Sequence, residues 1–69
     1  MGASVLIVDD VRAERQLTEE CLHRAGYEVA AAGNGLEALA RVDLHPVDVV
    51  LTEINLPEMD GLDLLRRLA

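Results

Sequence analysis

Apolar residues recur along the chain with spacings that predict strands and helices in turn. The first block, Val5 to Val8, is short, continuous and rich in β-branched residues, which favours a buried strand. The next block, Val11 to Ala25, places one apolar stripe on a helix, made of Leu17, Cys21, Leu22 and Ala25. The polar side of that helix carries Arg12, Glu14, Arg15, Glu19, Glu20 and His23. Gly26 is expected to end it in a left-handed conformation.

The middle of the chain repeats this order of strand and helix. Tyr27 to Ala32 reads as a weaker strand, whose small alanines favour an edge or a tightly packed position. Asn34 is a suitable N-cap with Glu37 three residues later, so a second helix begins here. Its expected buried face is Leu36, Leu39, Ala40 and Val42. Pro46, after His45, forbids continuation of the helix.

A third unit follows. Asp48 to Thr52 is apolar on both faces, which is typical of a central strand in a covered sheet. Asp60 and Asp63 then mark the start of a last helix, with apolar contacts expected from Leu62, Leu64, Leu65 and Leu68. Right-handed crossovers turn this βαβαβα order into an α/β fold, a doubly wound parallel sheet with strand order 2-1-3. Residues 1–69 are expected to form a single domain.

Composition narrows the classes of function. The chain has 69 residues, 51% of them hydrophobic, and Tyr27 is its one aromatic residue, so the core must be aliphatic. Thirteen acids face six arginines with no lysine, for a net charge of −7. This balance argues against nucleic-acid binding and suits a cation or a basic partner. No apolar run reaches membrane length, and no signal peptide is expected, because the N-terminus lacks a basic start followed by a long apolar stretch. A lone cysteine, Cys21, excludes an internal disulfide and favours a cytoplasmic location.

Carboxylates follow two of the predicted strands. Asp9 and Asp10 come directly after the first strand, and Glu53 comes directly after the third. Strands 1 and 3 are neighbours in the 2-1-3 order, so these acids should meet in one crevice. Crowded carboxylates repel unless protons or a metal neutralise them, and hard oxygen ligands favour Mg²⁺, with Ca²⁺ or Mn²⁺ as substitutes. Singly, Asp10 could cap the first helix, Asp9 could be solvated and Glu53 could be a loop carboxylate; together they favour a metal site.

The cysteine and the two histidines are interpreted as structural or surface residues rather than as reactive ones. Cys21 lies on the apolar stripe, so a small core residue is expected rather than a nucleophile. His23 lies on the polar side of its helix and His45 in a loop. Neither has convergent cysteine or histidine partners, so no transition-metal site is predicted.

Three stretches resemble a known family. They are Val5-Leu6-Ile7-Val8-Asp9-Asp10, Asn34-Gly35-Leu36-Glu37-Ala38-Leu39, and residues 48–68 with the loop Leu56-Pro57-Glu58-Met59-Asp60-Gly61. Together they resemble the receiver domain of two-component response regulators, which has a flavodoxin-like fold. The resemblance implies that Asp9 and Asp10 hold Mg²⁺, directly or through water, with the backbone carbonyl of Asn55. It also implies as partners a sensor histidine kinase, whose phosphohistidine donates the phosphoryl group, and an output domain that reads the switched surface.

The chain departs from that family at the phosphoacceptor. The family has aspartate where this sequence has Glu53, and the added methylene moves the carboxylate outward by about 1.5 Å. In-line phosphoryl transfer tolerates little misplacement, so a glutamyl phosphate should form poorly. Glu53 is instead expected to mimic the phosphorylated state as a fixed charge. A naturally phosphorylation-independent receiver and an introduced substitution both remain open.

The second departure is length, because three of the family's five βα units are present. The hydroxyl residue after strand 4 and the lysine after strand 5 have no counterpart in residues 1–69. In this three-strand sheet the third strand becomes an edge with unpaired backbone groups, and the helix layer beside the first helix is incomplete. We therefore expect a homo-oligomer through the strand-3 edge, or exchange of elements. Alternatively, the sequence is a piece of a longer protein.

Three functions remain open from the sequence. The first is a non-enzymatic receiver module, phosphorylation-deficient or phosphomimetic, that acts through protein contact. The second is a fragment of a Mg²⁺-dependent phosphotransfer or phosphatase enzyme, which is weakened by the lack of a phosphate-binding glycine motif. The third is a structural, self-associating piece of a longer regulator.

Overall fold

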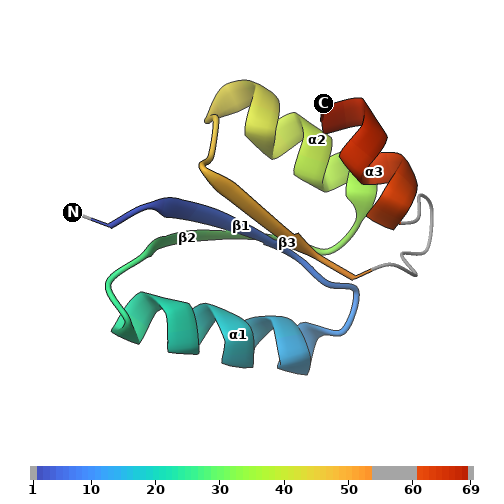
Figure 1. Ribbon diagram of the computed structural model, residues 1–69. Helices are drawn as coiled ribbons and strands as arrows, with labels where there is room; N and C mark the ends of the chain where they lie inside the picture. The colour runs from blue at the N-terminus through green and yellow to red at the C-terminus, as the bar shows by residue number, and fades with distance from the viewer. Residues whose placement is uncertain (1, 54–60, 69) are drawn as a thin grey trace.

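A computed structural model of the chain describes residues 2–53 and 61–68. The elements are β1 (Ser4–Val8), α1 (Arg12–Arg24), β2 (Glu28–Ala32), α2 (Gly35–Leu44), β3 (Val49–Thr52) and α3 (Gly61–Leu68). The predicted order βαβαβα is therefore confirmed, with most boundaries within a residue or two of the expected ones (Figure 1). No helix in these described ranges is long and apolar enough to cross a membrane.

The three strands form one parallel sheet in the predicted order β2-β1-β3. The register pairs Val5 of β1 with Val29 on one side and Val49 on the other. Both β2 and β3 are edges of the described sheet, as expected for a 2-1-3 order. The expectation that the third strand is covered on both faces is wrong, because Val49 and Leu51 remain 48% and 49% exposed.

Helices cover the two faces of the sheet unequally. α1 lies on one face, packed against β2 and β1, whereas α2 and α3 lie together on the other (Figure 1). The core sits between the sheet and the α2–α3 layer and consists of Leu6, Val8, Ala32, Ala38 and Leu64. Val5 and Ile7 alternate with these β1 residues and are also buried. The sheet is thus covered by two helices on its α2–α3 face, whereas on the other face α1 covers β1 and β2.

The side of α1 that approaches the sheet differs from the predicted stripe. Its half-buried residues are Arg15, Thr18, Glu19 and Leu22. Leu17 is 64% exposed and Cys21 is exposed, so the prediction that both are core residues is wrong. Of the predicted stripe, Leu22 is half-buried, whereas Leu17, Cys21 and Ala25 are exposed. Gly26 follows the helix with φ of 96°, which confirms its predicted left-handed role.

The start of α2 matches its prediction. The Asn34 side chain accepts a hydrogen bond from the backbone N–H of Glu37 at 2.8 Å, and Glu37 Oε2 accepts one from the N–H of Gly33 at 3.2 Å. The helix ends at Leu44, before His45 and Pro46, as expected. Its sheet-facing residues are Gly35, Ala38, Leu39 and Val42. Leu36 is 53% exposed and Ala40 is exposed, so the prediction that they are buried is wrong. The residue before each of them, Gly35 and Leu39, faces inward instead.

The last helix contributes to the core. Leu64 is fully buried, and the half-buried Leu68 packs against the same cluster, which confirms both predicted contacts. α3 reaches that core beside α2. Asp60 and the side chains of Leu62 and Leu65, which the sequence also assigned to this helix, lie outside the described residues.

Candidate metal centre

The carboxyl ends of β1 and β3 place two acids side by side. Asp9 directly follows β1 and is 7% exposed, while Glu53 directly follows β3 and is exposed. Backbone hydrogen bonds continue past both strand ends: the N–H of Asp9 donates to the carbonyl of Ala32 at 3.1 Å, and that of Glu53 to the carbonyl of Val8 at 3.0 Å. The sheet itself therefore fixes where these two side chains begin.

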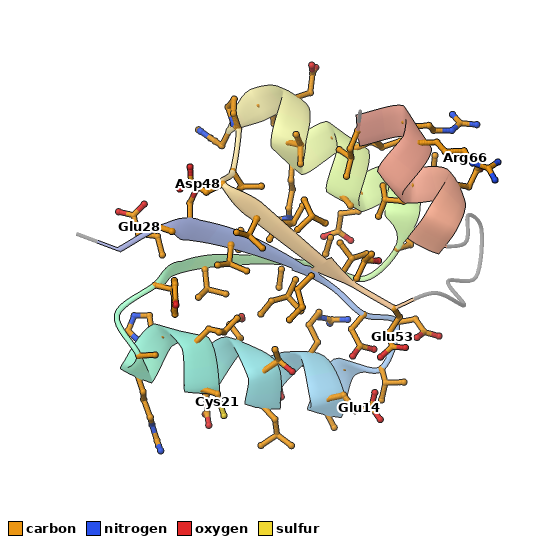
Figure 2. All side chains as sticks on the ribbon, in the orientation of Figure 1. Glu14, Cys21, Glu28, Asp48, Glu53 and Arg66 are labelled. Atoms are coloured by element: carbon orange, nitrogen blue, oxygen red, sulfur yellow. The ribbon has the colours of Figure 1, made fainter. Side chains whose placement is uncertain are left out.

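A third carboxylate joins them from α1. Asp9, Glu14 and Glu53 each offer a carboxylate oxygen, and these atoms all lie within 4.8 Å of one another. Figure 2 shows Glu14 and Glu53 approaching each other at this end of the molecule. Sequence reasoning assigned Glu14 only to the polar side of its helix. Its position in the sequence could have indicated this role, because Glu14 lies in the first turn of α1, five residues after Asp9 and therefore close to the end of β1.

One predicted ligand, Asp10, is not part of this group. Asp10 is exposed and does not belong to the acidic group among the described residues. It does not cap α1 either, because Val11 is the N-cap residue and no side chain caps the helix. Asp9 Oδ1 instead accepts a hydrogen bond from the backbone N–H of Val11 at 2.9 Å. Asn55 lies outside the described residues, so its expected carbonyl ligand is not tested.

A neighbouring arginine holds the loop without pairing with the carboxylates. Arg15 Nη1 donates to the backbone carbonyl of Asp9 at 2.8 Å. The described ion pairs are elsewhere, between Arg41 and Glu37 and between Arg67 and Asp63. Within the described ranges, the acidic group is therefore not neutralised by an arginine ion pair.

The crowding of the carboxylates changes the pKa of Glu14. Repulsion from the Asp9 carboxylate, followed by desolvation and the charge of Glu53, raises the pKa of Glu14 above its ordinary value. A side-chain hydrogen bond with Asp9 and the charge of Asp10 act in the same direction. Removing a proton from Glu14 thus adds a third negative charge to a crowded place, and a bound cation would relieve the same repulsion.

The three oxygens fit a hard divalent cation. Ligand oxygens lie about 2.1 Å from Mg²⁺ and about 2.4 Å from Ca²⁺, so oxygens that share one ion must lie within about 5 Å of one another. The three oxygens lie within 4.8 Å of one another, and Glu14 and Glu53 are exposed side chains that can rotate toward a shared ion. Carboxylate oxygen is also the donor type that both ions prefer. The chemistry of the donors therefore suits Mg²⁺.

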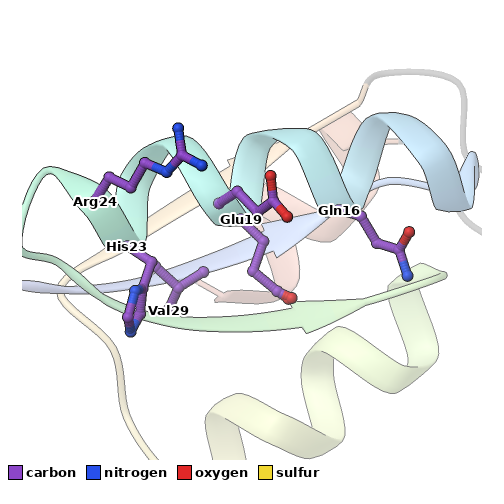
Figure 3. Close-up of a pocket in the computed structure, with 6 residues that line it drawn as sticks. Gln16, Glu19, His23, Arg24 and Val29 are labelled. Carbon is purple, nitrogen blue, oxygen red and sulfur yellow. The ribbon is translucent and has the colours of Figure 1, made fainter.

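Two surface hollows border α1 on opposite sides. A hollow of about 200 Å³ adjoins the acidic group and is lined by Ile7, Val8, Asp9, Thr18, Leu51, Thr52 and Glu53. A larger groove of about 580 Å³ lies between α1 and β2, lined by Gln16, Glu19, Glu20, His23, Arg24 and Val29 (Figure 3). The larger groove mixes charges of both signs, whereas the smaller one opens beside the three carboxylates.

Comparison with known proteins decides the family. Residues 5–69 match the family model of the response regulator receiver domain. The chain belongs to the response regulator receiver family. Both strand ends of the acidic group fall inside the matched region, and receiver domains bind Mg²⁺ at an acidic pocket. The resemblance noted in the sequence is confirmed.

Individual relatives agree with this assignment. The receiver is 41% identical over 69 residues to the chemotaxis protein CheY of Thermotoga maritima, covering 99% of this chain and 58% of that protein. It is 40% identical over 68 residues to the sporulation initiation phosphotransferase F of Bacillus subtilis, covering 99% and 55%. The solved structure of the chemotaxis response regulator CheY4 of Vibrio cholerae superposes with a TM-score of 0.94 at 39% identity, covering 97% and 56%. The chain thus spans little more than half the length of each.

Proposed function

We propose that this receiver domain binds Mg²⁺ through Asp9, Glu14 and Glu53, and that it serves two-component signalling as a phosphorylation-deficient or phosphomimetic module. The observation that carries the proposal is the convergence of the three carboxylate oxygens within 4.8 Å at the ends of β1 and β3. From the family resemblance, Asp10 would contribute through water and Asn55 through its backbone carbonyl. Bound Mg²⁺ would supply positive charge at the place where these three carboxylates converge.

Glu53 is proposed to act as a fixed negative charge. Its backbone N–H is held by the hydrogen bond to the carbonyl of Val8, so the backbone does not shift to compensate for the extra methylene of the side chain. A phosphoryl group on Glu53 would replace its single carboxylate charge with about two negative charges beside the carboxylates of Asp9 and Glu14. The nearby Arg15 is already bonded to the carbonyl of Asp9. Both features disfavour acceptance of a phosphoryl group and favour a standing charge that partners read.

Acetyl phosphate tests this proposal. Intact mass measured after incubation with acetyl phosphate and Mg²⁺ should show no added phosphoryl group, while calorimetry shows that Mg²⁺ binds. Glu53→Asp is the matched variant, and it should gain the phosphoryl mass in a larger fraction of molecules, because its shorter side chain restores in-line geometry. Phosphate located on Glu53 in the unmodified chain would overturn the fixed-charge proposal. An absence of Mg²⁺ binding would overturn the metal site.

The proposed partners follow from the family. Contact with a sensor histidine kinase or with the output domain of a response regulator would let the receiver transmit its state without a chemical step of its own. Receiver domains are generally signalling modules rather than enzymes. We therefore propose no catalytic activity for residues 1–69, and the cytoplasmic location expected from the sequence stays a prediction. Binding to a purified kinase, measured with the unmodified chain and with Glu53→Gln, tests whether the charge is read.

Self-association through β3 is a second proposal, supported by one observation. β3 pairs with β1 along one edge, and in the described sheet its other edge has no partner strand. Such an edge favours pairing with a second copy. Sedimentation velocity over a hundredfold range of protein concentration should show a shift to a dimer. A sedimentation coefficient and melting temperature independent of concentration would contradict it.

A further inference from the structure

The helix α2 carries a row of apolar side chains that the domain does not cover. Leu36, Ala40 and Leu44 recur every fourth residue, so they lie in one row along the helix. Leu36 is 53% exposed, Leu44 is 74% exposed and Ala40 is exposed. We call these three residues the α2 stripe. Single exposed leucines are ordinary on a protein surface, whereas a continuous apolar row is a candidate interaction surface.

The α2 stripe points away from the sheet. The residues of α2 that face the sheet are Gly35, Ala38, Leu39 and Val42. Successive residues of a helix are rotated by about 100°, so the mean direction of the stripe is about 150° from that of the sheet-facing residues. α3 packs beside α2 rather than above it (Figure 1). The stripe is therefore on the outer surface of the α2–α3 layer.

The complete receiver fold would leave the α2 stripe open as well. α2 packs over β2 and β1. In the flavodoxin-like strand order 2-1-3-4-5, the fourth and fifth strands follow β3 on the side away from β2. The helices that accompany them lie in the two layers on the faces of the sheet, whereas the stripe points out of its layer. A cover for the stripe must therefore come from another molecule.

The α2 stripe is complementary to itself. Ala40 is its midpoint, with one leucine four residues before it and the other four residues after it. If two copies of α2 cross antiparallel at Ala40, a twofold axis passes between the two alanines. Leu36 of each copy then meets Leu44 of the other, about 6 Å along the helix from the crossing point. The small side chain of Ala40 lets the two helices approach closely where they cross.

Charge beside the stripe also suits a second copy. Glu37 and Arg41 lie on one flank of the stripe and form an ion pair at 3.5 Å. With the crossing at Ala40, Arg41 of the second copy would lie on the same flank, about 3 Å along the helix axis from Glu37. Each arginine could then reach a glutamate of either copy, so this flank is neutral although the chain carries a net charge of −7. The exposed Asp43 on the other flank would limit the affinity.

We propose that the α2 stripe joins two copies of this receiver through an antiparallel helix pair centred on Ala40. A contact made by one helix of ten residues is small, so the pair is weak and reversible. It differs from pairing of β3 edges. In that arrangement the two α2 helices would be at least four strand spacings apart, about 19 Å, which is about twice the distance between packed helices.

Disulfide formation between chosen positions tests both the surface and the direction of the pair. Leu36→Cys and Leu44→Cys are each made together with Cys21→Ser, which removes the chain's one cysteine. One variant is labelled with nitrogen-15, the two are mixed in equal amounts in a glutathione redox buffer, and intact mass separates mixed dimers from like ones. Mixed dimers should exceed like dimers at least about fivefold, because two cysteines at the same position are about 12 Å apart along the axis and too far for a disulfide.

A cysteine at the midpoint gives an independent test. Helix axes about 8–10 Å apart bring facing Cα atoms to within about 5 Å, a span that a disulfide bridges. Ala40→Cys with Cys21→Ser should therefore form a disulfide dimer at least about tenfold faster than the unmodified chain, whose exposed Cys21 lies on the other face of the sheet.

Ala40→Glu is the variant that should break the pair. Added to both cysteine variants of the mixing experiment, it places two like charges on the twofold axis and should reduce mixed dimers to the level of like dimers. Glutamate is a good helix former and position 40 is exposed, so circular dichroism should show an intact fold.

Four results would overturn the proposal. Equal amounts of mixed and like dimers would indicate random contact, and an excess of like dimers would indicate a parallel pair. Excess mixed dimers that persist with Ala40→Glu would place the contact elsewhere. A cysteine at position 40 that reacts no faster than Cys21 would mean that a second copy is not the occupant of the α2 stripe.

Discussion

Ser4 and Asp48 bind each other at the start of β1 and β3. Asp48 Oδ2 accepts hydrogen bonds from the backbone N–H of Ser4 at 2.8 Å and from its hydroxyl at 3.1 Å. The backbone N–H of Asp48 donates to the carbonyl and the hydroxyl oxygen of Ser4, each at 3.0 Å. This contact fixes the β1–β3 register from the end opposite the acidic group, and the register is what brings Glu53 beside Asp9.

Replacing Asp48 should therefore weaken both the fold and the acidic site. Asp48→Ala removes the acceptor of two hydrogen bonds, so we expect a loss of about 1–2 kcal/mol in the free energy of unfolding and weaker Mg²⁺ binding. Urea unfolding and calorimetry measure the two effects. Asp43→Ala, an exposed acid on α2, is the control and should change neither. Equal effects of the two substitutions would show that the contact is unimportant.

Glu14→Gln tests the carboxylate that comes from α1. Removing one charge from the group should raise the melting temperature of the metal-free protein, because repulsion with Asp9 falls. The same substitution should reduce the increase in melting temperature that Mg²⁺ produces. Glu20→Gln, on another side of α1, keeps the same net charge as Glu14→Gln and should leave the Mg²⁺ effect intact. If both variants behaved alike, total charge rather than position would be responsible.

The pH dependence of stability follows from the sign of the Glu14 shift. Its pKa is raised by folding, so the folded state binds the proton more tightly than the unfolded state does. This contribution to stability is fully present below the ordinary glutamate pKa and is lost as pH rises through the raised value. The stability advantage of Glu14→Gln over the unmodified protein should thus be greatest at neutral pH and shrink on acidification. Thermal melts between mildly acidic and neutral pH would show this, and an advantage that is constant with pH would contradict it.

Truncation of a core side chain on α3 should destabilise the domain strongly. Leu64 is fully buried in the cluster with Leu6 and Val8, so Leu64→Ala should cost about 2–5 kcal/mol through lost contacts and a cavity. A domain this small has little stability to spare, and a large unfolded fraction is expected at 25 °C. Leu44→Ala, at a position 74% exposed, should cost less than about 0.5 kcal/mol. Denaturant curves of both variants test whether α3 belongs to the cooperative core.

The helix cap of α2 gives a local test. Asn34→Ala removes the acceptor for the Glu37 N–H and should cost about 1 kcal/mol, whereas Asn34→Asp keeps an oxygen acceptor and should cost much less. Thermal melts compare the two directly. Equal losses would mean that the cap bond contributes little.

The sequence by itself determined the elements, the parallel order and the meeting of Asp9 with Glu53. Each of these depends on local patterns: β-branched runs, the Asn34 cap, the glycine stop, and acids placed directly after strands that a right-handed crossover makes neighbours. Tertiary structure decided the rest. The rotation of α1 about its own axis brought Glu14 into the acidic group and left Leu17 and Cys21 exposed. That rotation is set by packing against β1 and β2, and a stripe in the sequence does not say which neighbour will cover it.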